Sequence, residues 1–133
     1  MNRAPLYTDE AHEREHLRYT VKRSEQSLTV TLLARINQLN GPPLRDRLRH
    51  EIDDGARWIT IDVSACEAID RDQLGALFSV GLYVRRPAFG GNVEILNPQP
   101  QVAAAFTYWG VERAFTFAYT ADRLPLVPSE VTR

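Results

Sequence analysis

Two histidines and a glutamate near the start of the printed sequence have the spacing of a zinc-binding pattern. His12-Glu-Arg-Glu-His16 has the form H-E-x-x-H, in which two histidines one helical turn apart hold zinc and the glutamate acts as a general base. The surroundings argue against that chemistry, because the segment is densely charged and a catalytic zinc site needs a third protein ligand and a substrate cleft. His50 is the only other histidine. We therefore expect no metal site and attribute the match to chance in a charge-rich segment.

Two further features are candidates for chemical sites. Cys66 is the only cysteine and precedes a predicted helix, whose N-terminus can lower the pKa of a thiol. No second cysteine or nearby histidine accompanies it, which favours a half-buried structural thiol. Gly90-Gly91 has neither of the spacings found in glycine-rich phosphate-binding loops. The residues therefore predict no catalytic site, no cofactor and no enzymatic activity.

A charged segment, Asp70-Arg71-Asp72-Gln73, stands at the start of a predicted helix. Asp70 and Gln73 have the spacing of a capping box, in which each side chain bonds the backbone of the other residue. Asp72 would lie in the first turn, where the helix macrodipole favours a carboxylate by about 0.3–1 kcal/mol. Arg71 stands between two carboxylates and is expected to pair with one of them or with an acidic group of a partner. Exposed pairs contribute only about 0–1 kcal/mol, so stability alone gives little reason for this arginine.

The elements that position this segment follow from the spacing of apolar residues. Alternation predicts a hairpin from two strands, and Trp58 begins a short apolar run that predicts a buried central strand. Spacings of three and four predict three helices, ended by breaks such as Gly55 and Gly110. The aromatic residues near the end have helical and strand spacing and are expected in the core. The predicted strands are 17–22, 28–33, 58–63, 93–96 and 115–119, and the predicted helices cover 42–54, 70–82 and 100–109. The aromatic residues are Tyr108, Trp109, Phe115 and Phe117.

This order of elements predicts one α/β domain. Strands that alternate with helices form a mostly parallel sheet, here a mixed sheet with an antiparallel N-terminal hairpin and helices packed over it. We expect residues 1–16 to be a flexible N-terminal arm, because they are polar and interrupted by Pro5. The domain is expected over residues 17–124 and a short C-terminal tail over 125–133.

The composition excludes several classes of function. The chain has 133 residues, of which 44% are hydrophobic and 25% charged, as is ordinary for one globular domain. Its net charge of −1 offers no basic surface for nucleic acid. No apolar run approaches the roughly 20 residues that span a bilayer, and the first residues do not resemble a signal peptide. With a single cysteine, the expected location is the cytoplasm.

Residues 59–78 resemble the signature of the STAS family, named for sulfate transporters and anti-sigma factor antagonists. Ile61-Asp-Val-Ser64 matches the strand end, and Asp70 with Leu74-Gly-Ala-Leu77 matches the helix start. Leu33-Ala-Arg-Ile-Asn37, the Gly90-Gly91 pair and Trp109-Gly-Val111 also correspond to family positions. The similarity covers about residues 18–124. It implies a STAS-like fold and a regulatory, protein-binding role in signalling and transcription.

The same resemblance implies that the phosphorylation switch of the family is absent. In relatives that are switched, the acceptor is the second serine of Asp-Ser-Ser-Gly, which places Asp72 at the acceptor, Arg71 at the first serine and Gln73 at the glycine. Asp72 has no hydroxyl group for a serine kinase. Two interpretations stay open: Asp72 imitates a permanently phosphorylated state, or it is only a carboxylate that favours the start of a helix.

The resemblance implies a protein partner, either an anti-sigma factor with serine kinase activity or a related switch protein. It would contact the start of the helix at Asp70 and the adjacent loops. The alternative is a small STAS subunit of a bacterial ABC-type lipid transporter, bound to its ATPase subunit. The predicted contact residues are Asn37, Gln38, Asp70, Arg71, Asp72 and Gln73.

Overall fold

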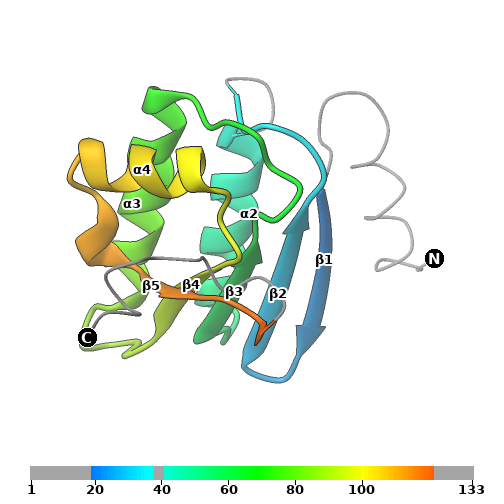
Figure 1. The fold of residues 1–133 in the computed structure, drawn as a ribbon. Helices are drawn as coiled ribbons and strands as arrows, with labels where there is room; N and C mark the ends of the chain where they lie inside the picture. Colours follow the sequence, from blue (N-terminus) through cyan, green and yellow to red (C-terminus); the bar gives the residue numbers. More distant parts are fainter. Residues whose placement is uncertain (1–18, 38–40, 122–133) are drawn as a thin grey trace.

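The computed structural model describes residues 19–37 and 41–121 (Figure 1). In chain order, the elements are β1 (Tyr19–Ser24), β2 (Ser27–Leu32), α2 (Gly41–Asp53), β3 (Trp58–Asp62), α3 (Arg71–Val84), β4 (Asn92–Leu96), α4 (Pro100–Tyr108), a short 3-10 helix η1 (Glu112–Ala114) and β5 (Thr116–Ala118). The predicted α/β class and the predicted order of strands and helices are confirmed. The expected arm, the expected tail and both predicted domain limits fall outside the described residues and stay predictions.

The five strands form one sheet in the order β1-β2-β3-β4-β5. β1 and β2 are antiparallel and are joined by a two-residue turn in which Glu25 has a φ of 54°. The other neighbours are parallel. Each helical connection therefore moves the chain one strand further in the same direction, and right-handed connections of this kind place every helix on the same face. Figure 1 shows α2, α3 and α4 together on that side.

The other face of the sheet carries no helix among the described residues. One row of paired residues crosses all five strands on this face and consists of Lys22, Thr29, Thr60, Glu94 and Thr116. β3 is central, as predicted, but the predicted burial holds for only one of its two faces. Ile59 and Ile61 are buried, whereas Trp58 is 52% exposed on the open face. The one-sided placement of the helices explains this alternation.

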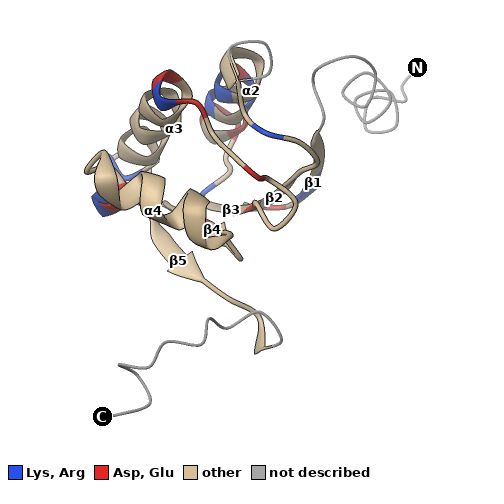
Figure 2. Cartoon of the chain, turned by 45° about the horizontal axis from the view of Figure 1, so that its top comes forward, with Lys and Arg blue, Asp and Glu red and all other residues tan. Residues whose placement is uncertain are grey.

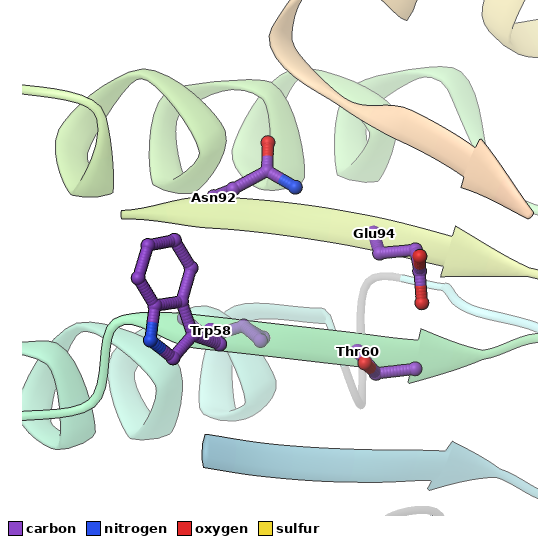
Figure 3. A pocket seen from close by; sticks show the side chains of 5 residues that line it. Trp58, Thr60, Asn92 and Glu94 are labelled. Carbon is purple, nitrogen blue, oxygen red and sulfur yellow. The ribbon is translucent and has the colours of Figure 1, made fainter. Parts of the chain in front are cut away.

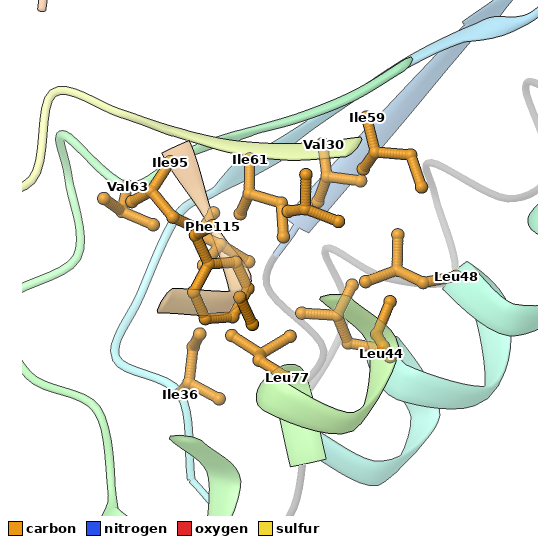
Figure 4. Packing of buried hydrophobic residues seen from close by; sticks show 14 of the residues in the cluster. Val30, Ile36, Leu44, Leu48, Ile59, Ile61, Val63, Leu77, Ile95 and Phe115 are labelled. Atoms are coloured by element: carbon orange, nitrogen blue, oxygen red, sulfur yellow. The ribbon is translucent and has the colours of Figure 1, made fainter. Parts of the chain in front are cut away.

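Apolar side chains fill the space between the sheet and the helices (Figure 4). α2 contributes Leu44, Leu48 and Ile52, which repeat every four residues and are all fully buried. In the C-terminal part of the described chain, the ring of Phe106 in α4 meets those of Phe115 and Phe117 edge to face. The ring centroids are 5.3 and 5.4 Å apart. Such edge-to-face pairs add about 0.5–1.5 kcal/mol each to the effect of burial.

An ion-pair cluster joins β1 to α2 at the edge of this core. The carboxylate of Glu51 lies 2.5 Å from Nη1 of Arg23 and 2.9 Å from Nε of Arg47. Burial by itself raises the pKa of Glu51, but the hydrogen bonds and charges of Arg47 and Arg23 outweigh it, and the pKa is lowered. The cluster therefore holds Glu51 ionised, although only 12% of its side chain is exposed.

The helices of the described residues are short. α2, α3 and α4 contain 13, 14 and 9 residues. Within residues 19–37 and 41–121, no helix has both the length and the apolar character needed to cross a lipid bilayer.

Candidate functional site

The loop that leads into α3 is tied to the segment that follows β2. The backbone of Ile36 donates a hydrogen bond to Ala68 and accepts one from Asp70, at 3.1 and 2.9 Å, and Ile36 forms an isolated parallel bridge with Ile69. Asn37, the next residue, is thereby held near the start of α3. Two predicted contact residues from separate parts of the sequence, Asn37 and Asp70, are brought together in this way.

Asp70 occupies the N-cap position of α3, with extended backbone angles of φ −68° and ψ 144°. Its side chain makes no capping hydrogen bond. Instead, Oδ1 of Asp70 accepts a 2.8 Å hydrogen bond from Nη2 of Arg35. The predicted capping box between Asp70 and Gln73 is therefore wrong, because an arginine from a distant part of the sequence competes for the carboxylate.

Gln73 lies below the surface. Only 8% of the residue is exposed, and its Oε1 has no hydrogen-bond partner among residues 19–37 and 41–121. The side chain packs against the start of α2, since a Cβ added to Gly41 would lie 2.0 Å from Oε1 of Gln73. Gln73 thus lies between α2 and α3 at this end of the molecule. A partner would contact the exposed residues Arg71 and Asp72 before it reached Gln73.

Arg71 and Asp72 form the exposed first turn of α3. Of the alternatives for Arg71, pairing with Asp70 or Asp72 is not observed, because its guanidinium lies over the ring of Trp109, 4.7 Å from the centroid. Pairing with an acidic group of a partner stays a prediction. Within the described part of the chain, Asp72 has no ion pair or side-chain hydrogen bond. Figure 2 shows charged residues of both signs at this end of α3. The turn thus presents a carboxylate and a ring-supported guanidinium side by side.

Cys66 precedes this turn and is fully buried, more so than predicted. Its Sγ donates a hydrogen bond to the carbonyl oxygen of Ala68 at 3.2 Å. Burial has the largest effect on the thiol and raises its pKa. The predicted structural role therefore fits, since a neutral, enclosed thiol is a poor nucleophile.

Two of the candidates predicted from the sequence cannot be placed. Gln38 and the pattern from His12 to His16 lie outside the described residues. Residues 19–37 and 41–121 contain no group of three or more histidine, cysteine, aspartate or glutamate side chains arranged to hold a metal ion.

A shallow depression of about 220 Å³ lies on the open face of the sheet (Figure 3). The indole of Trp58 stands at one end of it and the carboxylate of Glu94 at the other, with Thr60 and Asn92 beside them. Asn92 is engaged by the next strand, because its amide donates a 3.0 Å hydrogen bond to Thr116. The depression and the start of α3 lie on opposite sides of the sheet, since the depression is on the face that the helices leave open.

Sequence reasoning missed the two aromatic residues beside the first turn of α3. Tyr108 and Trp109 are expected in the core from their spacing, but they are 77% and 44% exposed. α4 ends at Tyr108, so Trp109 falls outside the helix and does not share the buried face of Val102 and Phe106. Gly110, whose φ is 71°, then turns the chain. The signal available in the sequence is this glycine, which follows the C-cap residue Trp109 and marks the end of the helix before it.

No protein-family model matches the chain, and no curated protein matches its sequence. Solved structures do match its fold. A proposed anti-sigma factor antagonist from Thermotoga maritima is 18% identical, with a TM-score of 0.68 over 86% of this chain and 95% of that protein. The anti-sigma factor antagonist SpoIIAA in its unphosphorylated form is 17% identical, with a TM-score of 0.65 over 78% of this chain and 90% of that protein. The phosphorylated form of SpoIIAA, from Bacillus, is 14% identical, with a TM-score of 0.62 over 86% of this chain and 99% of that one.

The same fold also occurs inside a longer protein of another kind. The murine solute carrier 26 family member A9, an anion transporter, is 14% identical, with a TM-score of 0.58 over 93% of this chain but only 19% of the transporter. At these identities the similarity establishes the fold and leaves the function open. The STAS-like architecture predicted from the residues is confirmed, and the chain has the fold of the anti-sigma factor antagonists.

Proposed function

We propose that the chain is a regulatory protein-interaction module that acts like an anti-sigma factor antagonist and does not catalyse a reaction. One observation carries the proposal. Asp72 is exposed in the first turn of α3 and has no ion pair or side-chain hydrogen bond to any described residue. A carboxylate held at a helix start and left without a partner is suited to bind donor groups of another protein.

The contact residues are taken from the two segments that meet at this point. Asn37 follows the bridge between Ile36 and Ile69, and Asp70, Arg71 and Asp72 follow it on the other side. Gln73 supports the turn from below and acts on the partner through Arg71 and Asp72. Gln38 belongs to the proposed contact set on sequence grounds.

The module is proposed to be insensitive to serine phosphorylation at this turn. A phosphoserine carries about −1.5 to −2 charge and three acceptor oxygens, whereas Asp72 supplies a single negative charge at all times. The partner would be an anti-sigma factor with serine kinase activity or a related switch protein. The chain would bind it in one fixed state, either as a permanent imitation of the phosphorylated form or as a plain acidic contact.

The test uses purified switch kinases from the source organism, each mixed with the full chain and radiolabelled ATP. The unchanged chain should bind one kinase and take up no phosphate. Asp72→Ser should be labelled by that kinase, and Asp72→Ala, the matched control without a hydroxyl, should not. Binding without any labelling of Asp72→Ser would contradict the assignment of residue 72 to the acceptor position.

A second role is supported by the occurrence of this fold within an anion transporter. In that role the chain is a small STAS subunit of a bacterial ABC-type lipid transporter and binds the ATPase subunit, for which the absence of a serine at position 72 has no cost. The same binding assay with the purified ATPase subunit distinguishes the two roles. Stable binding of the ATPase and of no kinase would replace the first proposal by the second.

A further inference from the structure

One side of the molecule carries exposed and half-buried aromatic and arginine side chains along α3 and the end of α4. We call it the α3–α4 surface and define it by Arg71, Gly75, Phe78 and Leu82 of α3, Tyr108 and Trp109 at the end of α4, and Arg113 of η1. The four residues of α3 are spaced by four, three and four, so they share one face of the helix. Leu82 is 45% exposed, at the other end of α3 from Arg71. The surface thus runs from the proposed contact turn along the helix.

The arginines of this surface are held by rings. The guanidinium of Arg71 lies 4.7 Å from the ring centroid of Trp109, and that of Arg113 lies 4.8 Å from the centroid of Phe78. Tyr108 meets Trp109 edge to face, with centroids 4.8 Å apart. A guanidinium stacked in this way keeps the N–H groups at its edge available as donors while its flat face is covered.

Arg71 and Arg113 differ from four other arginines, which form ion pairs. Carboxylates of the described residues bond four arginines elsewhere: Arg23, Arg35, Arg45 and Arg47. Neither Arg71 nor Arg113 forms an ion pair within the described part of the chain, although Asp72 and Glu112 are their neighbours in sequence. Arg113 donates one hydrogen bond, to the carbonyl oxygen of Gly110 at 2.8 Å. The surface therefore offers positively charged donors that are fixed in place and not neutralised.

The composition and the shape of the surface suit a protein partner. Tryptophan, tyrosine and arginine are the residues most enriched among those that contribute strongly to protein binding. Gly75 lies between Arg71 and Phe78 on this surface, and a Cβ added to it would meet no atom of the described residues within 4 Å, apart from the neighbouring backbone of its own helix. A partner chain can therefore approach the backbone of α3 closely at this point.

We propose that the α3–α4 surface binds a protein segment that presents a carboxylate beside a large apolar side chain. The carboxylate accepts hydrogen bonds from Arg71 or Arg113, and the apolar side chain packs against Tyr108 and Trp109. The inference rests on the proposed function and deepens it, because Arg71 belongs to both the contact turn and this surface. It identifies the partner by its chemistry, as acidic and apolar.

The two tryptophans of the chain provide an internal control for the test. Trp109 belongs to the α3–α4 surface, whereas Trp58 is 52% exposed on the open face of the sheet. Each indole N–H gives its own signal in a nitrogen–proton correlation spectrum. The probes are two synthetic helical peptides that differ only in carrying glutamate or lysine at the positions flanking a row of leucines. The glutamate peptide should shift the signal of Trp109 and leave that of Trp58 unchanged, and the lysine peptide should bind at least tenfold more weakly.

Variants locate the contact on the surface. Trp109→Ala and Tyr108→Ala should each weaken binding of the glutamate peptide about tenfold, and Arg71→Ala should remove most of the preference for glutamate. The matched controls are Trp58→Ala, another exposed tryptophan, and Arg49→Ala, whose guanidinium also lies over a ring, that of Tyr83 at 4.4 Å. Both controls should bind as the unchanged chain does, and urea unfolding of each variant verifies that it is folded.

Three outcomes would overturn the inference. They are equal binding of the two peptides, a shift of Trp58 in place of Trp109, and a shift of Trp109 on concentrating the chain alone, which would assign the surface to a second copy. The proposed function fails separately. A switch kinase that shifts the backbone signal of Asp72 and leaves Trp109 unaffected supports the contact turn and contradicts the α3–α4 surface.

Discussion

Arg35 donates a 2.8 Å hydrogen bond to the carboxylate of Asp70 and so joins the segment after β2 to the residue before α3. The carboxylate stands at an N-cap position and yet bonds no N–H of the helix. Its contribution to stability should therefore depend on Arg35. The pair is exposed, which limits that contribution to about 0.2–1 kcal/mol.

A double-mutant cycle tests this dependence. Asp70→Ala alone should lower the free energy of unfolding by this small amount, and adding it to Arg35→Ala should cost nothing beyond the loss caused by Arg35→Ala itself. Urea denaturation measures all three. A further loss on changing Asp70 in the Arg35→Ala background would mean that the side chain caps α3 after all, since removing an N-cap costs about 0.5–2 kcal/mol.

The buried amide of Gln73 should make the chain less stable than it need be. A buried polar group without a partner costs about 1–3 kcal/mol, and Gln73→Met keeps the length of the side chain without its unpaired oxygen. We expect this variant to raise the free energy of unfolding by about 1 kcal/mol. Gln99→Met is the matched control and should lower it, because Gln99 donates a 2.9 Å hydrogen bond to the carbonyl oxygen of Ser64.

Glu51 should make stability depend on pH in the acid range. Its pKa is lowered in the folded chain, so its stabilising effect is fully present above the pKa of the unfolded chain, about 4.5, and is lost as pH falls through the folded value. Glu51→Gln should lower the free energy of unfolding at pH 7 by about 1.5–3 kcal/mol, as is typical of hydrogen bonds to charged groups. It should also flatten the pH profile below about pH 5. An unchanged acid profile in this variant would assign the acid sensitivity to other carboxylates.

Cys66 should make stability depend on pH in the alkaline range. Burial raises the pKa of its thiol in the folded chain, so the stabilising effect is present below the unfolded pKa, about 9.0, and is lost as pH rises through the folded value. The free energy of unfolding should therefore fall above about pH 9, and less steeply in Cys66→Ala. The buried phenol of Tyr19, whose pKa burial also raises, accounts for part of the remaining slope. Rapid reaction of the native thiol with a disulfide reagent at pH 7 would contradict the buried, neutral state.

The sequence is sufficient to predict the elements but not the contacts between distant residues. The spacing of Leu44, Leu48 and Ile52 predicts α2 because burial of one helical face dominates their energetics. The bond between Arg35 and Asp70 spans 35 positions, and no local pattern indicates it. The burial of Gln73 is equally hidden, because its polar type and its place beside Asp72 both favour a surface position.

The open face of the sheet depends on topology, which the alternation of residues does not specify. Trp58 begins an apolar run of the kind that strands buried on both faces show. Only the strand order places all three helices on one side and leaves its indole exposed. Trp109 is also more exposed than its sequence pattern predicts. The helix ends one residue earlier than predicted, so Trp109 lies at the surface and not in the core.

The sequential strand order has a consequence for how the chain folds as it is synthesised. From β2 onward, every described strand pairs with the strand made just before it. No strand has to wait for a later one to reach its place, so each new helix and strand can add to an edge that already exists. Structure can therefore grow from the N-terminal hairpin towards β5 during translation, without the long loop closures that slow the folding of sheets whose neighbouring strands lie far apart in sequence.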